Sequence, residues 1–189
     1  RYWDDTFAQL WGDLDAAGLL DDTLVVFWTD HGEQFMERRT IDHSDDIHAE
    51  ENKSTAAFWA RGLEPLAWTA PTQHGDIGAT LFDLYGVQPP VPPDGHVLGL
   101  AADQPRFFAH YSVQTGPLQL GVTTGSRTLI YKWDGFKALY HDDTDPGELS
   151  SVYAPADPDV IALWDLLMPT VLQAESQWPH FGPPVDPGP

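Results

Sequence analysis

The sequence contains no cysteine, and only nine of its 189 residues are lysine or arginine. The absence of cysteine excludes disulfides, thiolate metal ligands and cysteine nucleophiles within this chain. With 29 acidic residues the formal net charge is −20, and such a surface repels nucleic acid, whose phosphates are bound by clustered basic side chains. No apolar run reaches the roughly 18 residues that a membrane span needs. We therefore expect no nucleic-acid partner and no membrane span in this chain.

Hydrophobic residues make up 42% of the sequence, and their spacing predicts several elements. Residues 1–20 carry aromatic and aliphatic side chains at helical spacing. The run "TLVVFW" (23–28) is typical of a strand buried on both faces of a parallel sheet, and "TAAFWA" (55–60) predicts a second buried strand. The segment "DIGATLFDLY" (76–85) predicts a helix. Polar residues without periodicity fill 30–53, which we interpret as a long functional loop with one helical turn.

The pattern changes after the proline-rich connector "QPPVPPDG" (88–95). Short apolar runs separated by glycine-bearing turns follow, as expected of an antiparallel meander. The segment "PDVIALWDLLMPTVL" (158–172) predicts a helix against that sheet, with Pro169 as its end or a kink. The chain thus divides into three parts: an α/β segment, 1–95; a small antiparallel sheet with a covering helix, 96–178; and an irregular tail, 179–189.

The first apolar run leads directly into the sequence Asp-His-Gly-Glu at 30–33. In open parallel sheets, ligands bind beyond the carboxyl ends of the strands. A carboxylate beside an imidazole can bind one divalent cation, and Gly32 allows the sharp turn that brings Asp30 and His31 together. The alternative is that Asp30 caps the next segment and His31 is merely exposed, because short motifs often match by chance. The preceding apolar strand favours the metal site.

Two histidines and several carboxylates lie in the loop "IDHSDDIHAEENKS" (41–54). They could complete a metal site or provide acid–base groups. For the individual carboxylates Asp45, Asp46, Glu50 and Glu51, a solvated acidic loop is a better explanation than a role in such a site. The negative charge of the chain does not exclude an anionic substrate, because a bound cation can invert the local field.

Four segments, in order, resemble sulfatases of the alkaline phosphatase superfamily. The first is "GLLDDTLVVFWTDHGEQF" (18–35), which resembles the strand and Asp-His-Gly-Glu turn of that family. The others are "HAEENKSTAAFWARG" (48–62), "QHGDIGATLFDLYGVQPP" (73–90) and "KALYHDDTDPGELSSVYA" (137–154). Together they cover most of the chain and are far more specific than any one of them alone.

The resemblance implies the C-terminal part of an alkaline-phosphatase-like α/β sheet sandwiched by helices, followed by the small antiparallel sheet and its covering helix. Sulfatases bind one divalent cation, usually calcium, and two of its ligands would here be Asp30 and His31; manganese and zinc are the alternatives. Some members place a Lys or His about a dozen residues later, where it touches the sulfate or protonates the leaving oxygen. That position falls at His43, with His48 as the competitor.

The nucleophile of the family lies in a C/S-x-P-x-R motif, whose Cys or Ser is oxidised to formylglycine, and this motif has no counterpart here. It belongs to an N-terminal half, together with an Asp pair that donates the other metal ligands. Because the chain begins at Arg1 within a helical pattern, we interpret it as the C-terminal portion of a sulfatase-like hydrolase that acts on a sulfate-ester small molecule or glycan. The resemblance also implies an exported location, periplasmic or extracellular.

Two other interpretations stay open. A phosphodiesterase, a phosphonate monoester hydrolase or a phosphoglycerol transferase of the same superfamily shares the Asp-His motif and often uses manganese or zinc, whereas the closing "DP.E" pattern favours a sulfatase. Alternatively, the chain is a non-catalytic structural or binding fragment.

Overall fold

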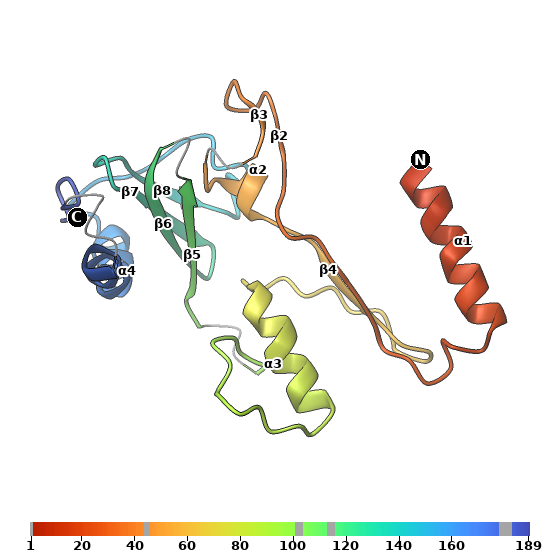
Figure 1. The fold of residues 1–189 in the computed structure, drawn as a ribbon. Helices are drawn as coiled ribbons and strands as arrows, with labels where there is room; N and C mark the ends of the chain where they lie inside the picture. The colour runs from red at the N-terminus through yellow and green to blue at the C-terminus, as the bar shows by residue number, and fades with distance from the viewer. Residues whose placement is uncertain (1, 44–45, 101–103, 113–115, 178–182) are drawn as a thin grey trace. The chain divides into compact units, whose positions relative to one another are not determined.

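The chain forms two compact units in the computed structural model (Figure 1). Unit 1 comprises Arg1–His31 and Ser54–Trp68, and unit 2 comprises Gly32–Lys53 and Thr69–Pro189. The expected first segment, 1–95, therefore contributes to both units. Among the described residues, no helix has the length and apolar character that crossing a membrane requires. The described residues are 2–43, 46–100, 104–112, 116–177 and 183–189.

Unit 1 contains one helix and one pair of strands. They are α1 (Tyr2–Ala16), β1 (Val25–Trp28) and β4 (Ala56–Trp59). The two strands pair antiparallel, so that Val25 lies opposite Trp59 and Trp28 lies opposite Ala56. The helix and both strands are thus where the sequence predicts them.

Aromatic rings of α1 pack on this strand pair. The ring of Trp3 lies 5.6 Å from that of Phe27 in β1, and the ring of Trp11 meets that of Trp59 in β4 edge-on at 4.6 Å. Gly18 follows the helix with φ +67°, the left-handed conformation that commonly ends helices. The helical spacing of the aromatic residues therefore reflects packing within unit 1.

The prediction that β1 and β4 are buried in a parallel sheet is wrong for this structure. The two strands are antiparallel, their residues are partly or largely exposed, and the side chain of Trp28 is 53% exposed. A continuous apolar run indicates that both faces of a strand are to be covered. The rings of α1 cover part of this surface, and in the described part of the chain the rest stays open to solvent.

Unit 2 contains the remaining elements. They are β2 (Gln34–Phe35), β3 (Ile41–Asp42), α2 (Ala49–Asn52), α3 (His74–Leu84), β5 (Arg106–Ser112), β6 (Gly116–Thr124), β7 (Arg127–Lys132), β8 (Lys137–His141) and α4 (Pro158–Gln177). The short helix α2 is the helical turn predicted within 30–53. The β2–β3 hairpin was not predicted, because strands of two residues leave no periodic pattern in a sequence.

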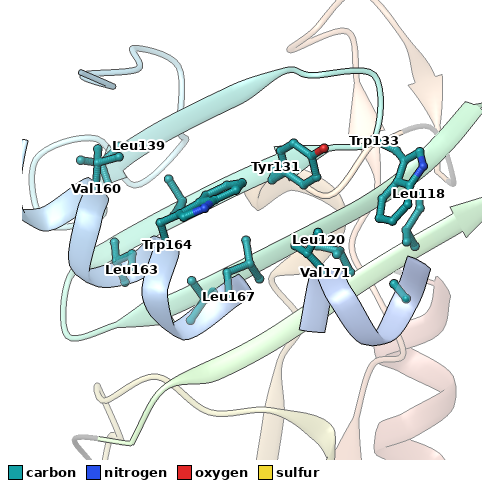
Figure 2. Close-up of a cluster of buried hydrophobic side chains, with 13 residues drawn as sticks. Leu118, Leu120, Tyr131, Trp133, Leu139, Val160, Leu163, Trp164, Leu167 and Val171 are labelled. Carbon is teal, nitrogen blue, oxygen red and sulfur yellow. The ribbon is translucent and has the colours of Figure 1, made fainter. Parts of the chain in front are cut away.

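Strands β5 to β8 form an antiparallel sheet in chain order, which confirms the predicted meander. Helix α4 covers one face, and Figure 2 shows its apolar side chains pointing onto the strands. Trp164 of α4 meets the ring of Tyr131 in β7 edge-on, with centroids 5.2 Å apart. Pro169 does not end α4, which continues to Gln177. The main buried residues of this core are Leu118, Leu120, Val122, Leu129, Tyr131, Leu139, Val160, Leu163, Trp164, Leu167 and Val171.

Helix α3 is anchored by Asp76, whose side chain is fully buried. Its carboxylate accepts hydrogen bonds from Arg106 Nε at 3.0 Å and from the backbone N–H groups of His96 at 2.8 Å and Gln73 at 3.1 Å. A buried carboxylate needs such partners, because leaving it unpaired would cost several kcal/mol. The first turn of α3 is thereby tied to the start of β5.

Candidate metal and acid–base site

The first candidate ligands follow the end of β1. The backbone N–H of Thr29 donates to the carbonyl of Thr55 at 2.9 Å, and the N–H of Thr55 donates to Thr29 Oγ1 at 3.0 Å. The strand pairing therefore continues one residue beyond β1. Asp30 and His31 come next, at the point where this pairing stops.

The side chains of Asp30 and His31 face each other. His31 Nε2 lies 3.5 Å from Asp30 Oδ2, and the backbone N–H of His31 donates to Asp30 Oδ1 at 3.0 Å. The side chain of Asp30 is 86% exposed and that of His31 is 41% exposed, so a ligand can reach both. Two atoms at this separation can bind one ion, since metal–ligand bonds are about 2.0–2.6 Å long. A carboxylate oxygen and an imidazole nitrogen suit zinc and manganese at least as well as calcium.

A second group of titratable side chains gathers at the β2–β3 hairpin. His43 Nδ1 lies 3.3 Å from Glu33 Oε2 and 3.0 Å from Asp42 Oδ1. One possible metal-binding atom from each of these residues lies within 4.8 Å of the others. The sequence analysis singled out His43 but not its neighbours Glu33 and Asp42. The signals were present, because Glu33 closes the Asp-His-Gly-Glu turn and Asp42 directly precedes His43.

His48, the competitor of His43, lies in a different environment. It is buried, with Nδ1 2.5 Å from Asp46 Oδ1 and Nε2 3.1 Å from the hydroxyl of Tyr140. Burial raises the pKa of the Asp46 carboxyl. The hydrogen bond and charge of His48 and the charge of Lys132 lower this pKa by more than burial raises it, so that it lies well below its usual range. Both ring nitrogens of His48 thus contact the protein, and His48 fastens the loop to the sheet.

A groove of about 490 Å³ in unit 2 collects basic side chains. Four of the nine lysines and arginines of the chain line it, and three of these four already have acidic partners. Arg38 Nε lies 3.1 Å from Glu50 Oε2. Lys132 lies 3.1 Å from Asp46, and Lys137 lies 2.8 Å from Asp186. In a chain with a net charge of −20, the groove thus brings four basic side chains together, beside the carboxylates of Glu37 and Asp46. The four basic residues are Arg38, Arg39, Lys132 and Lys137.

No model of a known protein family matches the sequence, and no curated protein matches it. Solved structures do match. BT4656, solved with its substrate D-glucosamine-2-N,6-O-disulfate, is 17% identical with a TM-score of 0.70, and the match covers 97% of this chain and 40% of that protein. BT1596, a 2-O glycosaminoglycan sulfatase, is 17% identical with a TM-score of 0.57, covering 85% of this chain and 37% of that one.

The phosphonate monoester hydrolase of Agrobacterium radiobacter is also similar, with 20% identity, a TM-score of 0.65, and coverage of 92% of this chain and 39% of that one. These neighbours belong to the alkaline phosphatase superfamily. At such identities the likeness concerns the fold, and it confirms an α/β chain with small antiparallel sheets and a C-terminal helix. The chain spans about 40% of the length of the first of these neighbours.

Proposed function

We propose that this chain is the C-terminal portion of a metal-dependent sulfuric ester hydrolase of the sulfatase type. The observation that carries the proposal is the facing pair of Asp30 and His31, 3.5 Å apart at the end of β1, in a fold shared with sulfatases. An exposed carboxylate and imidazole at a strand end are suited to holding a cation against an anionic substrate.

In this proposal Asp30 and His31 supply two ligands of a divalent cation, with calcium as the usual metal of such enzymes and manganese or zinc as the alternatives. When bound, the cation polarises the ester and stabilises the charge that develops on its oxygens. Asp30 and His31 orient the group that binds there, because their side chains already converge. The remaining ligands and the formylglycine nucleophile would come from an N-terminal portion of the same protein.

His43 is proposed to donate a proton to the leaving oxygen. Glu33 and Asp42 face its Nδ1, so they hold a proton on that atom and orient the ring. Transfer to the substrate would then proceed from Nε2. The side chain of His43 is partly exposed, which gives a substrate access to the ring.

The proposed substrate is a sulfate ester, either a small molecule or a sulfated glycan. BT4656 is similar in fold and binds a disulfated glucosamine, and the basic groove of unit 2 offers cations to an anionic sugar. An exported, periplasmic or extracellular location goes with this proposal. The apolar surface left open around β1 and β4 fits a chain whose sheet continues in the N-terminal portion.

A second candidate is the hydrolysis of a phosphonate monoester or a phosphodiester. The observation that favours it is the likeness to the phosphonate monoester hydrolase, which has a TM-score of 0.65. Asp30 and His31 would hold the cation in the same way, and His43 would again protonate the leaving oxygen. The two candidates therefore differ in the nucleophile and the substrate pocket.

The test is hydrolysis by the full-length protein of 4-nitrophenyl sulfate and, separately, of 4-nitrophenyl phenylphosphonate. We expect faster turnover of the sulfate than of the phosphonate. Asp30→Ala and His31→Ala should each lower the rate of hydrolysis by at least about 100-fold. The control Asp22→Ala, which removes an exposed carboxylate just before β1, should keep the wild-type rate. Faster turnover of the phosphonate would favour the second candidate. Turnover of neither ester would favour a non-catalytic role. Full activity in both site variants would remove Asp30 and His31 from the catalytic site. Residues 1–189 alone should hydrolyse neither ester.

A further inference from the structure

Gln34 is a buried polar side chain in the β2–β3 hairpin, the part of unit 2 that leads to His43. It is only 1% exposed. Its Nε2 donates to Glu51 Oε1 of α2 at 2.5 Å, and its Oε1 accepts a hydrogen bond from the hydroxyl of Thr40, the residue before β3. A buried amide is stable only when its polar atoms are bonded in this way. One side chain therefore ties β2 both to the other arm of the hairpin and to α2.

Glu51 holds the residues on both sides of Glu33. Its carboxylate accepts the Gln34 side chain, and its carbonyl accepts the backbone N–H of Gly32 at 2.8 Å. A Cβ at Gly32 would lie 2.0 Å from the carbonyl oxygen of Glu50, closer than any side chain tolerates, so this backbone is in tight contact with α2. Glu33 lies between the two attachment points, and its backbone is thereby fixed relative to α2.

The Glu51 carboxylate has a firm base of its own. It is 5% exposed, and Oε2 accepts the backbone N–H of Asp46 at 3.3 Å. The Asp46 carboxylate in turn lies 2.5 Å from His48 Nδ1 and 3.1 Å from Lys132 Nζ of β7. The contact between Gln34 and Glu51 is therefore connected to the four-stranded sheet, and all of these residues belong to unit 2.

The register of the hairpin carries this support to His43. Gln34 lies opposite Asp42. Glu33 directly precedes Gln34 and His43 directly follows Asp42, so the next pair along the hairpin is Glu33 and His43. Successive side chains of a strand point to opposite faces. With Gln34 buried on one face, Glu33 lies on the other, where its Oε2 is 3.3 Å from His43 Nδ1.

We propose that Gln34 and Glu51 are positioning residues for His43: their buried contact fixes the hairpin, and the hairpin holds Glu33 against Nδ1 of the imidazole. This inference rests on the proposed function, because it assigns the two residues to the proton donor proposed above. Both act through Glu33, since neither side chain contacts the His43 ring in the described bonds.

The test is steady-state hydrolysis of phenyl sulfate and of 4-nitrophenyl sulfate by the full-length protein. Phenolate is a poor leaving group that needs a proton, whereas 4-nitrophenolate leaves without one, so a misplaced acid slows the phenyl ester selectively. In Gln34→Ala, kcat for phenyl sulfate should fall by at least about 10-fold, while kcat for the nitrophenyl ester stays within about 3-fold of wild type. His43→Ala should show the same selective loss.

Gln173→Ala is the matched control, because Gln173 is an exposed glutamine of α4 in the same unit. It should hydrolyse both esters at wild-type rates. A merely structural role of Gln34 would slow both esters equally, through loss of folded enzyme. Equal losses on the two esters in Gln34→Ala, or no loss on either, would overturn the inference.

Hydrogen exchange followed by mass spectrometry provides a second measurement. In Gln34→Ala, peptides within 33–43 should exchange at least about 10-fold faster, while those of β6 and β7 stay protected. Unchanged exchange of the hairpin would overturn the inference. If Gln34→Ala does not fold, Thr40→Val, at a partly exposed position, removes the hydroxyl that donates to Gln34. It should shift both measurements in the same direction, and no shift would overturn the inference.

A failure of the proposed function gives a different result. Absence of sulfate turnover by the wild type, or equal losses on both esters in His43→Ala, would overturn the proposed role of His43 as the acid. The exchange measurement would still decide whether Gln34 holds the hairpin.

Discussion

Glu148 illustrates at the scale of one residue how burial changes chemistry. Its carboxylate is buried, which raises its pKa from 4.5 to about 7 even though Lys53 opposes the rise; Asp142 adds to the rise and Arg38 opposes it. At pH values between 4.5 and about 7, Glu148 holds a proton in the folded protein and has lost it in the unfolded chain. The stability that Glu148 contributes is therefore fully present below about pH 4.5 and is lost as the pH rises through about 7.

This sign leads to a prediction for the Glu148→Gln variant. When the pH is raised from about 5 to about 8, deprotonation of Glu148 should lower the free energy of unfolding of the wild type by on the order of 2–3 kcal/mol. Each pKa unit between the folded and unfolded states corresponds to about 1.4 kcal/mol. Glutamine at position 148 does not titrate. The free energy of unfolding of Glu148→Gln should therefore fall by about 2–3 kcal/mol less than that of the wild type over the same pH range. Urea unfolding at both pH values measures the difference, and equal pH dependence in the two proteins would contradict the prediction.

Single residues also mark the limit of what the sequence could predict about the site. Asp30 and His31 are neighbours in the chain and follow an apolar strand, so their convergence could be predicted from local rules alone. His43 could be placed by resemblance, and its carboxylate partner Glu33 lies ten residues earlier. The contact of Glu148 with Ala49 could not be predicted, because it depends on how the sheet brings distant segments together.

Helix α4 is the element on which the core of unit 2 depends. Leu167 is fully buried against the sheet (Figure 2). Its neighbour Leu166 is 38% exposed. Leu167→Ala should lower the free energy of unfolding of unit 2 by about 2–5 kcal/mol, since it leaves a cavity between the helix and the strands. Leu166→Ala is the matched control and should cost less than about 1 kcal/mol. Urea unfolding followed by circular dichroism measures both, and equal losses would contradict the assignment of the buried face.

Elements with a sustained pattern were predictable and short ones were not. The meander and α4 repeat their apolar residues over many positions, so their type and order followed from periodicity. The strands of the β2–β3 hairpin have two residues each, and Met36 and Arg39 between them adopt positive φ, which neither residue type signals. The apolar run of β1 correctly predicted a strand but wrongly predicted a parallel sheet around it. An apolar run indicates that both faces of a strand are to be buried, but it does not show which elements bury them.

At the scale of the whole molecule, the negative charge and the open apolar surface have separate consequences. A net charge of −20 opposes binding to nucleic acid, whereas four of the nine basic residues gather in one groove. The apolar surface of unit 1 includes Trp3 and Trp28, both more than half exposed. Because the chain spans about 40% of a neighbour such as BT4656, we propose that an N-terminal portion covers that surface and completes the metal site.

The most direct measurement is titration of the full-length protein with Ca²⁺ and, separately, with Mn²⁺, followed by calorimetry. We predict that the wild type binds at least one of these ions and that Asp30→Ala and His31→Ala each weaken that binding by about 10-fold or more. The control variants Asp22→Ala and His141→Ala should bind as the wild type does. Equal affinity in the wild type and both site variants would contradict the claim that the strand end of β1 holds the metal.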